Sequence, residues 1–188
     1  MDSESAASGP TGARLYQALE RIAALFRTQL REAAAHHGLP VVQLEALLYL
    51  ARANRYSDSP GALAEYLGVT RGTTSQTIMA LERLGFVVKT ADAVDGRLVH
   101  CSVTESGLAV AAAAHPGALM GLSADQWAEA DAAALQLLRV LQVARGARTF
   151  GLCQTCRHHQ SGPVRRCGLT GEVLTEVDAQ RLCREHQP

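Results

Sequence analysis

The sequence predicts a mainly α-helical chain with one small β-hairpin. Apolar residues recur every three or four positions through most of residues 13–144, which is the period of helices with one buried face. Glycine or proline interrupts this pattern at intervals of helical length. Within residues 86–103, β-branched residues gather on either side of a turn, as is typical of a hairpin.

Composition and charge favour a folded protein of the soluble class. Of the 188 residues 47 % are hydrophobic, enough for one compact domain or one domain with a small appendage. Eighteen basic and eighteen acidic side chains cancel, so nucleic-acid binding would need a local basic patch. Charged residues interrupt every long apolar run and the N-terminus lacks a signal-peptide pattern, so we expect a cytoplasmic protein without membrane contact.

The flanking helices follow from spacing and end signals. Residues 13–36 carry apolar side chains at helical intervals and stop before Gly38, and residues 41–53 form a second, leucine-rich helix. Ser123 and Gln126 can form a capping box for a last helix that runs to about Ala144.

The central segment, residues 60–85, has the spacing of a helix–turn–helix. Pro60 opens a short helix, the small Ala64 permits a close helix crossing, and Gly68 four residues later can adopt the positive φ of the turn. Thr70 can cap the second helix.

A hairpin and another helix follow this segment. The hairpin strands, residues 86–89 and 98–103, flank a turn at residues 92–96. A helix then follows Thr104 and is interrupted at residues 115–117.

The start of the second helix of the segment offers hydrogen-bonding groups and one arginine, with no acid. A major groove accepts a helix whose first side chains reach base edges and phosphates. The candidate DNA contacts are Thr70, Arg71, Thr73, Thr74, Ser75 and Gln76. The alternative is a short polar helix whose outer face simply meets water.

The residues that follow strengthen the first interpretation. The stretch GALAEYLGVTRGTTSQTIMALERLGFVVKTADAVDGRLVHCSVTESG resembles the helix–turn–helix and wing of the MarR family of winged-helix regulators. It carries Asp95-x-Arg97 at the wing, with Val103, Thr104 and Gly107 behind it. The likeness extends loosely over residues 13–145. It implies a homodimer held by the N- and C-terminal helices, with one recognition helix in each half-site of double-stranded DNA.

The chemistry of the wing agrees with a role at DNA. Arg97 near a hairpin tip suits a narrow minor groove, where the negative potential attracts a guanidinium group. Asp95 would repel phosphates and is better placed to orient Arg97 or to brace the wing. The alternative is an ordinary hairpin turn with a weak surface salt bridge.

The chain also departs from the family. Gln76 and Ala80 stand where such proteins often have basic residues, and the four basic and four acidic residues of segment 60–104 balance. Fewer phosphate contacts imply weaker non-specific binding, so dimerisation gains importance. The helix after Ser123 carries more apolar surface than one inward stripe requires, which favours a dimer interface over packing within one monomer.

Four of the five cysteines lie in the last 40 or so residues. Their spacing is Cys153-x₂-Cys156-x₁₀-Cys167-x₁₅-Cys183, and Cys183-x₂-His186 offers an alternative nitrogen ligand. A close pair with two further cysteines is typical of a metal centre in a reducing compartment, and a metal would stabilise a tail poor in apolar residues. Free cysteines in a mobile tail are the alternative.

Zinc and an iron–sulfur cluster both remain open for this tail. Zinc sites more often repeat a second tight pair, which Cys183 and His186 could supply. One close pair with two distant single cysteines is similar to some four-iron cluster proteins, and the spacing leans towards them. Cys101 lies apart from the tail and is expected to be a small core residue.

The expected organisation has three parts: a disordered N-terminus at residues 1–10, a MarR-like winged-helix domain with dimerisation helices at 11–146, and a cysteine-rich metal-binding tail at 147–188. The expected function is a dimeric, sequence-specific transcriptional regulator, for which redox state, a metal or a small-molecule effector are candidate signals. The alternative is a metal- or redox-carrying interaction module whose winged helix binds protein instead of DNA. Phosphate-binding loops and catalytic side-chain sets were not found, so we expect no enzyme.

Overall fold

The computed structural model describes residues 10–93, 95–114, 123–146 and 148–188. The expected disorder before Pro10 and the expected helix break at residues 115–117 lie outside these ranges. The first part of the chain comprises α1 (Pro10–His36), α2 (Val41–Arg52), α3 (Pro60–Leu67), α4 (Arg71–Arg83), β1 (Val87–Ala91), β2 (Val99–Val103), α5 (Glu105–Ala113) and α6 (Ala124–Ala144). The tail comprises β3 (Gly151–Leu152), the 3₁₀ turn η2 (Cys153–Thr155), β4 (His159–Gln160), β5 (Arg166–Cys167), α7 (Glu176–Ala179) and β6 (Leu182–Cys183).

The predicted fold class, mainly α-helical with a hairpin wing, is confirmed, and the tail adds two short antiparallel pairings, β3 with β6 and β4 with β5. Strands β1 and β2 pair antiparallel from Val87 opposite Val103 to Ala91 opposite Val99. One boundary was wrong: Pro10, expected in the disordered terminus, is the first residue of α1. Proline is favourable there because the first N–H groups of a helix have no partner within the helix.

Local signals fix the helix ends. Ser59 accepts a hydrogen bond from the Ala62 N–H at the start of α3, and Gly68 ends that helix in the left-handed region with φ of 66°. The predicted capping box of α6 is present in both directions between Ser123 and Gln126. Gly107, at the start of α5, lies so close to the Phe86 carbonyl oxygen that a Cβ there would collide with it.

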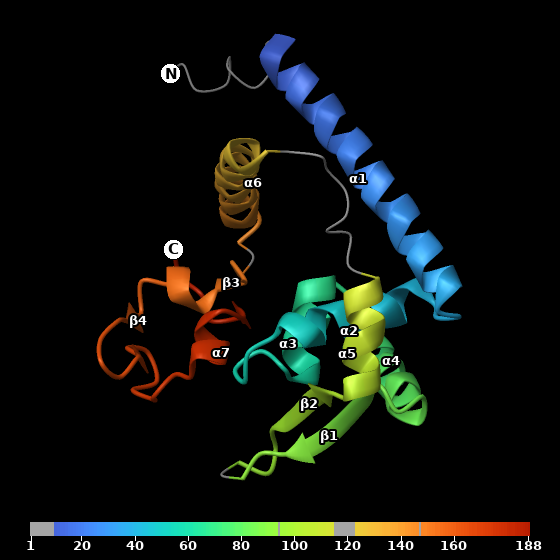
Figure 1. Cartoon of the computed structure of the whole chain (residues 1–188), viewed down its shortest axis with the longest axis vertical. Coiled ribbons are helices and arrows are strands. Elements are labelled where there is room, and N and C mark those ends of the chain that lie inside the picture. The colour runs from blue at the N-terminus through green and yellow to red at the C-terminus, as the bar shows by residue number, and fades with distance from the viewer. Residues whose placement is uncertain (1–9, 94, 115–122, 147) are drawn as a thin grey trace.

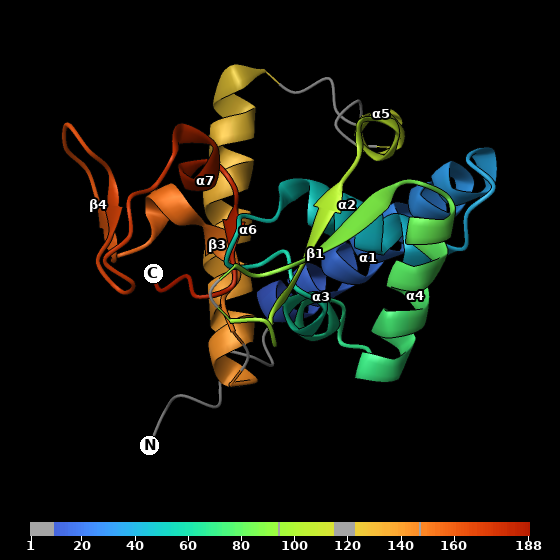
Figure 2. The ribbon, with the colours of Figure 1, turned by 90° about the horizontal axis from the view of Figure 1, so that it is seen from below.

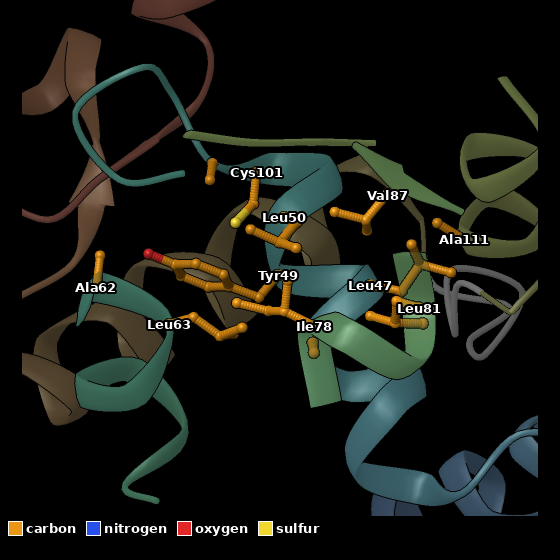
Figure 3. Packing of buried hydrophobic residues seen from close by; sticks show 12 residues of the cluster. Leu47, Tyr49, Leu50, Ala62, Leu63, Ile78, Leu81, Val87, Cys101 and Ala111 are labelled. Carbon is orange, nitrogen blue, oxygen red and sulfur yellow. The ribbon is translucent and has the colours of Figure 1, made fainter. Parts of the chain in front are cut away.

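The main hydrophobic core is built around α2. Tyr49 is fully buried in the centre of Figure 3, and its hydroxyl donates to the Ser57 carbonyl oxygen at 2.8 Å. Figure 3 shows side chains from α3, α4 and both hairpin strands around it; the labelled ones include Leu47, Leu50, Leu63, Ile78, Leu81, Val87 and Cys101. Burial of these apolar side chains is the main stabilising contribution to the domain.

The elements form a central body with extensions. α1 reaches far beyond the body, and α6 stands on the side of the body where the tail lies (Figure 1). The tail and α4 lie on opposite sides of the molecule in both views (Figures 1 and 2). Across the described ranges, no helix combines the length and apolar character that a membrane span requires.

Candidate nucleic-acid interface

The N-terminal turns of α4 present polar side chains to solvent. The Thr70 hydroxyl accepts from the Thr73 N–H at 3.1 Å and lies 2.9 Å from the Thr73 hydroxyl, so the cap orders the first turn. The side chains of Arg71, Ser75 and Gln76 are exposed. These residues form one outward face of α4, and their side chains could contact base edges in a groove of DNA.

Thr74 does not share this face. It is 1 % exposed, and its hydroxyl donates to the Thr70 carbonyl oxygen at 3.1 Å. Thr74 continues the inner row of Thr77, Ile78 and Leu81, which follow at helical spacing. The structure therefore removes Thr74 from the expected set of DNA contacts and assigns it to the core.

The turn of the wing is held by its two aspartates. The Asp95 N–H donates to Asp92 Oδ1 at 2.8 Å, and the Arg97 N–H donates to Asp95 Oδ1 at 3.0 Å. Asp95 thus braces the backbone of the turn, and the Arg97 side chain is exposed. Lys89 on β1 pairs with Glu82 on α4 at 2.8 Å, which ties the hairpin to the second helix of the helix–turn–helix.

A histidine clamp fixes the base of the wing to the loop before α3. His100 on β2 places Nδ1 2.7 Å from Asp58 Oδ1 and Nε2 3.0 Å from Asp92 Oδ2. The Cys101 N–H donates to the Asp58 carbonyl oxygen at 2.7 Å. This clamp was not predicted from the sequence, because Asp58 lies 42 positions before His100 and no local sequence pattern relates the two residues.

The contacts of the clamp shift the pKa values of His100 and Asp58. Hydrogen bonds to Asp58 and Asp92 raise the pKa of His100 above its usual value. Burial raises the pKa of Asp58, and the hydrogen bond with His100 works against that rise. Arg181 of the tail also acts to lower the pKa of Asp58. The two hydrogen bonds to carboxylates therefore favour the charged form of the His100 ring.

The four tail cysteines line one small cavity. Cys153, Cys156, Cys167 and Cys183 surround about 20 Å³ of space together with His158, His159 and Tyr56, among others. Burial, and then the neighbouring thiols of the other three cysteines, raise the pKa of Cys153 to about 11. The sequence thus identified four residues that the structure brings together.

His186, the alternative ligand, is not at this cavity. It is buried, with Nδ1 3.2 Å from the Thr149 hydroxyl and Nε2 3.0 Å from the Thr155 hydroxyl. Cys101 is separate from the tail cysteines and buried in the main core, as expected, and burial raises its pKa to about 12.

Comparisons with known proteins agree with this geometry. The family model that describes the MarR family matches residues 37–98, which contain α2 to α4 and β1. This segment of the chain is therefore similar in sequence to the MarR family. A comparison with curated protein sequences gave no match.

Solved MarR structures share the fold. The transcriptional regulator PA3341 is 27 % identical, with 68 % of this chain and 98 % of that chain covered and a TM-score of 0.55. A MarR family protein from Bacillus stearothermophilus is 20 % identical, with 70 % and 96 % covered and a TM-score of 0.58. Staphylococcus aureus MepR, solved as a complex with DNA, is 22 % identical, with 68 % and 98 % covered and a TM-score of 0.51.

The first prediction concerns the histidine clamp at the base of the wing. Because the pKa of His100 is raised in the folded state, its stabilising contribution is present below its unfolded pKa and is lost as pH rises through the folded pKa. We expect His100→Gln to lower the free energy of unfolding by about 1–2 kcal/mol at acidic pH, the scale of hydrogen bonds to charged groups.

Urea denaturation of both proteins from about pH 5.5 to about pH 8.5 measures this difference. The difference between wild type and variant should shrink towards the alkaline end. His36→Gln, at the exposed end of α1, is the matched control. A difference for His100→Gln that stays constant across this pH range would contradict the charged clamp.

Proposed function

We propose that the chain is a dimeric, DNA-binding transcriptional regulator that places α4 in the major groove and Arg97 of the wing in the minor groove. The observation that carries this proposal is the exposed polar start of α4 beside an exposed arginine on a braced wing. α4 and the hairpin lie at the same end of the body in Figure 1, away from the free ends of α1 and α6. The MarR relative MepR, solved with DNA, has the same fold.

The neutral net charge of the winged segment, residues 60–104, is less unfavourable for DNA binding than the sequence suggests, because its acidic side chains have partners within the protein. Glu82 pairs with Lys89, and Glu65 accepts two hydrogen bonds from the Arg184 guanidinium group. Asp92 and Asp95 serve the wing turn and the clamp. The acids of the segment are therefore engaged within the protein, which reduces their repulsion of phosphates and leaves Arg71 and Arg97 exposed for DNA.

We expect Arg97→Ala to weaken binding to the intergenic duplex upstream of its own gene by roughly tenfold, a loss of about 1.4 kcal/mol. The side chain is exposed, so the melting temperature should stay unchanged. Arg21→Ala on α1, far from the wing in Figure 1, is the matched control for loss of one positive charge.

Fluorescence anisotropy at two salt concentrations measures this effect. Equal affinity of Arg97→Ala and wild type at moderate salt would remove Arg97 from the interface. Failure of wild type to bind duplex DNA even at low salt would favour a protein-binding winged helix instead.

The dimer part of the proposal rests on α6. None of its 21 residues is buried within the monomer, although it carries large apolar side chains. Trp127, Leu135, Leu138, Val140 and Leu141 are between 41 % and 60 % exposed. α1 likewise exposes Leu15, Tyr16, Ile22, Leu25 and Phe26. Such contiguous apolar helix faces are typical of protein–protein interfaces, and the MarR resemblance implies a second copy of the chain as the partner.

Leu138→Asp and Leu141→Asp test this arrangement. A carboxylate at a buried interface costs several kcal/mol, so each variant should dissociate at micromolar concentration where wild type is dimeric. Sedimentation velocity measures the assembly state, and circular dichroism checks the helices. Gln136→Asp, on an exposed position of the same helix, is the control. A dimer that survives both leucine changes would place the interface elsewhere.

A further inference from the structure

Two small sheets converge on the cysteine cavity. β3 pairs with β6, which places Cys183 opposite Gly151 and next to the start of η2 at Cys153. β4 pairs with β5, which places Cys167 opposite His159. Cysteines that are up to 30 positions apart in the sequence therefore meet around one space, and the short strands hold them there.

The backbone around the cavity offers N–H groups to the sulfurs. The Gln187 N–H donates to Cys156 Sγ at 3.4 Å, and the Glu185 backbone makes a hydrogen bond to Cys183. N–H donors of this kind stabilise sulfur that carries negative charge, and they tune metal–thiolate centres.

Two buried side-chain nitrogen atoms near the tail cysteines lack a hydrogen-bond partner by geometry among the residues that the structure describes. Asn54 is 1 % exposed, and its Oδ1 accepts from the Tyr56 N–H and the Ser57 hydroxyl, which fixes the orientation of the amide. Its Nδ2 is one of the two atoms and lies close to Cys183. The other is Nδ1 of His159, a residue of the cavity wall. An unpaired buried N–H group is costly, and an anionic centre with sulfur atoms would accept from it.

The arrangement of the side chains favours a cluster over a single ion. Within the ranges that the structure describes, no group of three His, Cys, Asp or Glu side chains is arranged to hold a single metal ion. The four cysteines nevertheless line one cavity of about 20 Å³. In a four-iron cluster each cysteine binds a different iron atom, so the cysteine sulfur atoms lie further apart than they do around one zinc ion.

We propose that Cys153, Cys156, Cys167 and Cys183 bind an iron–sulfur cluster, with Asn54 and His159 as donors to its sulfur atoms. Binding forms four bonds between iron and cysteine sulfur and releases the four thiol protons to water, and it requires no electron transfer to or from the protein. Tyr56, which lines the cavity, comes from the winged-helix part of the chain, so the cluster would lie where the tail meets that domain.

Metal analysis of the full chain, purified without oxygen and then incubated with equal amounts of Fe²⁺ and Fe³⁺ and with sulfide, tests this proposal. We expect iron and acid-labile sulfide in a ratio of about one, with a brown colour. Cys101→Ala and His186→Gln should retain both, because neither side chain lies at the cavity. Cys156→Ser and Cys167→Ser should each lose most of the iron while their helices persist by circular dichroism.

Four outcomes would overturn the proposal. They are one zinc per chain without sulfide, protein without bound metal under these conditions, full iron and sulfide in either serine variant, or loss of iron in His186→Gln. None of these measurements depends on DNA binding, so the cluster and the proposed regulatory function fail or succeed separately.

Discussion

The loop between α2 and α3, residues 54–58, is the constraint on which the rest of the structure depends. Asn54 and Ser57 are buried, and each makes a hydrogen bond to the tail: the Asn54 N–H donates to the Leu182 carbonyl oxygen at 2.9 Å, and the Arg184 N–H donates to the Ser57 hydroxyl at 2.7 Å. The Ser57 carbonyl oxygen accepts from Tyr49 at the centre of the core. These hydrogen bonds restrict the conformation of the loop, because a change in it would leave further buried polar groups unpaired.

The wing and the tail are both positioned by contacts with this loop. Asp58 accepts from the Cys101 N–H and clamps His100, so the base of the wing is set by the loop. On the other side, Arg55 donates to the Val173 carbonyl oxygen and lies 3.6 Å from Glu172. The tail is therefore packed against the winged-helix part of the chain. The cavity of the four cysteines and the wing are separated by one short segment, residues 54–58.

The sequence predicts those features of the fold that depend on residues close together in the chain. Ser59, Thr70, Gly68 and the Ser123–Gln126 box act within four residues of their own positions, and each was predictable. The four tail cysteines could be grouped from the sequence because their spacing is typical of one shared site, and the structure brings them to one cavity. The clamp of His100 was not, since its partner Asp58 is brought near only by the folded domain. The tail strands, two residues long, are too short to show any periodicity. Thr74 could have been assigned to the core, because Ile78 and Leu81 repeat its side of the helix.

Amide hydrogen exchange of Arg55→Ala tests most directly whether the loop carries this constraint from the tail to the wing. The substitution removes contacts of the loop with Val173, Glu172 and Asp178 without touching the core. We expect faster exchange at the Asn54 N–H and also at the Cys101 N–H, while amides of α1 keep their wild-type rates. Faster exchange at Asn54 with an unchanged rate at Cys101 would contradict the account, because the wing would then be held independently of the tail.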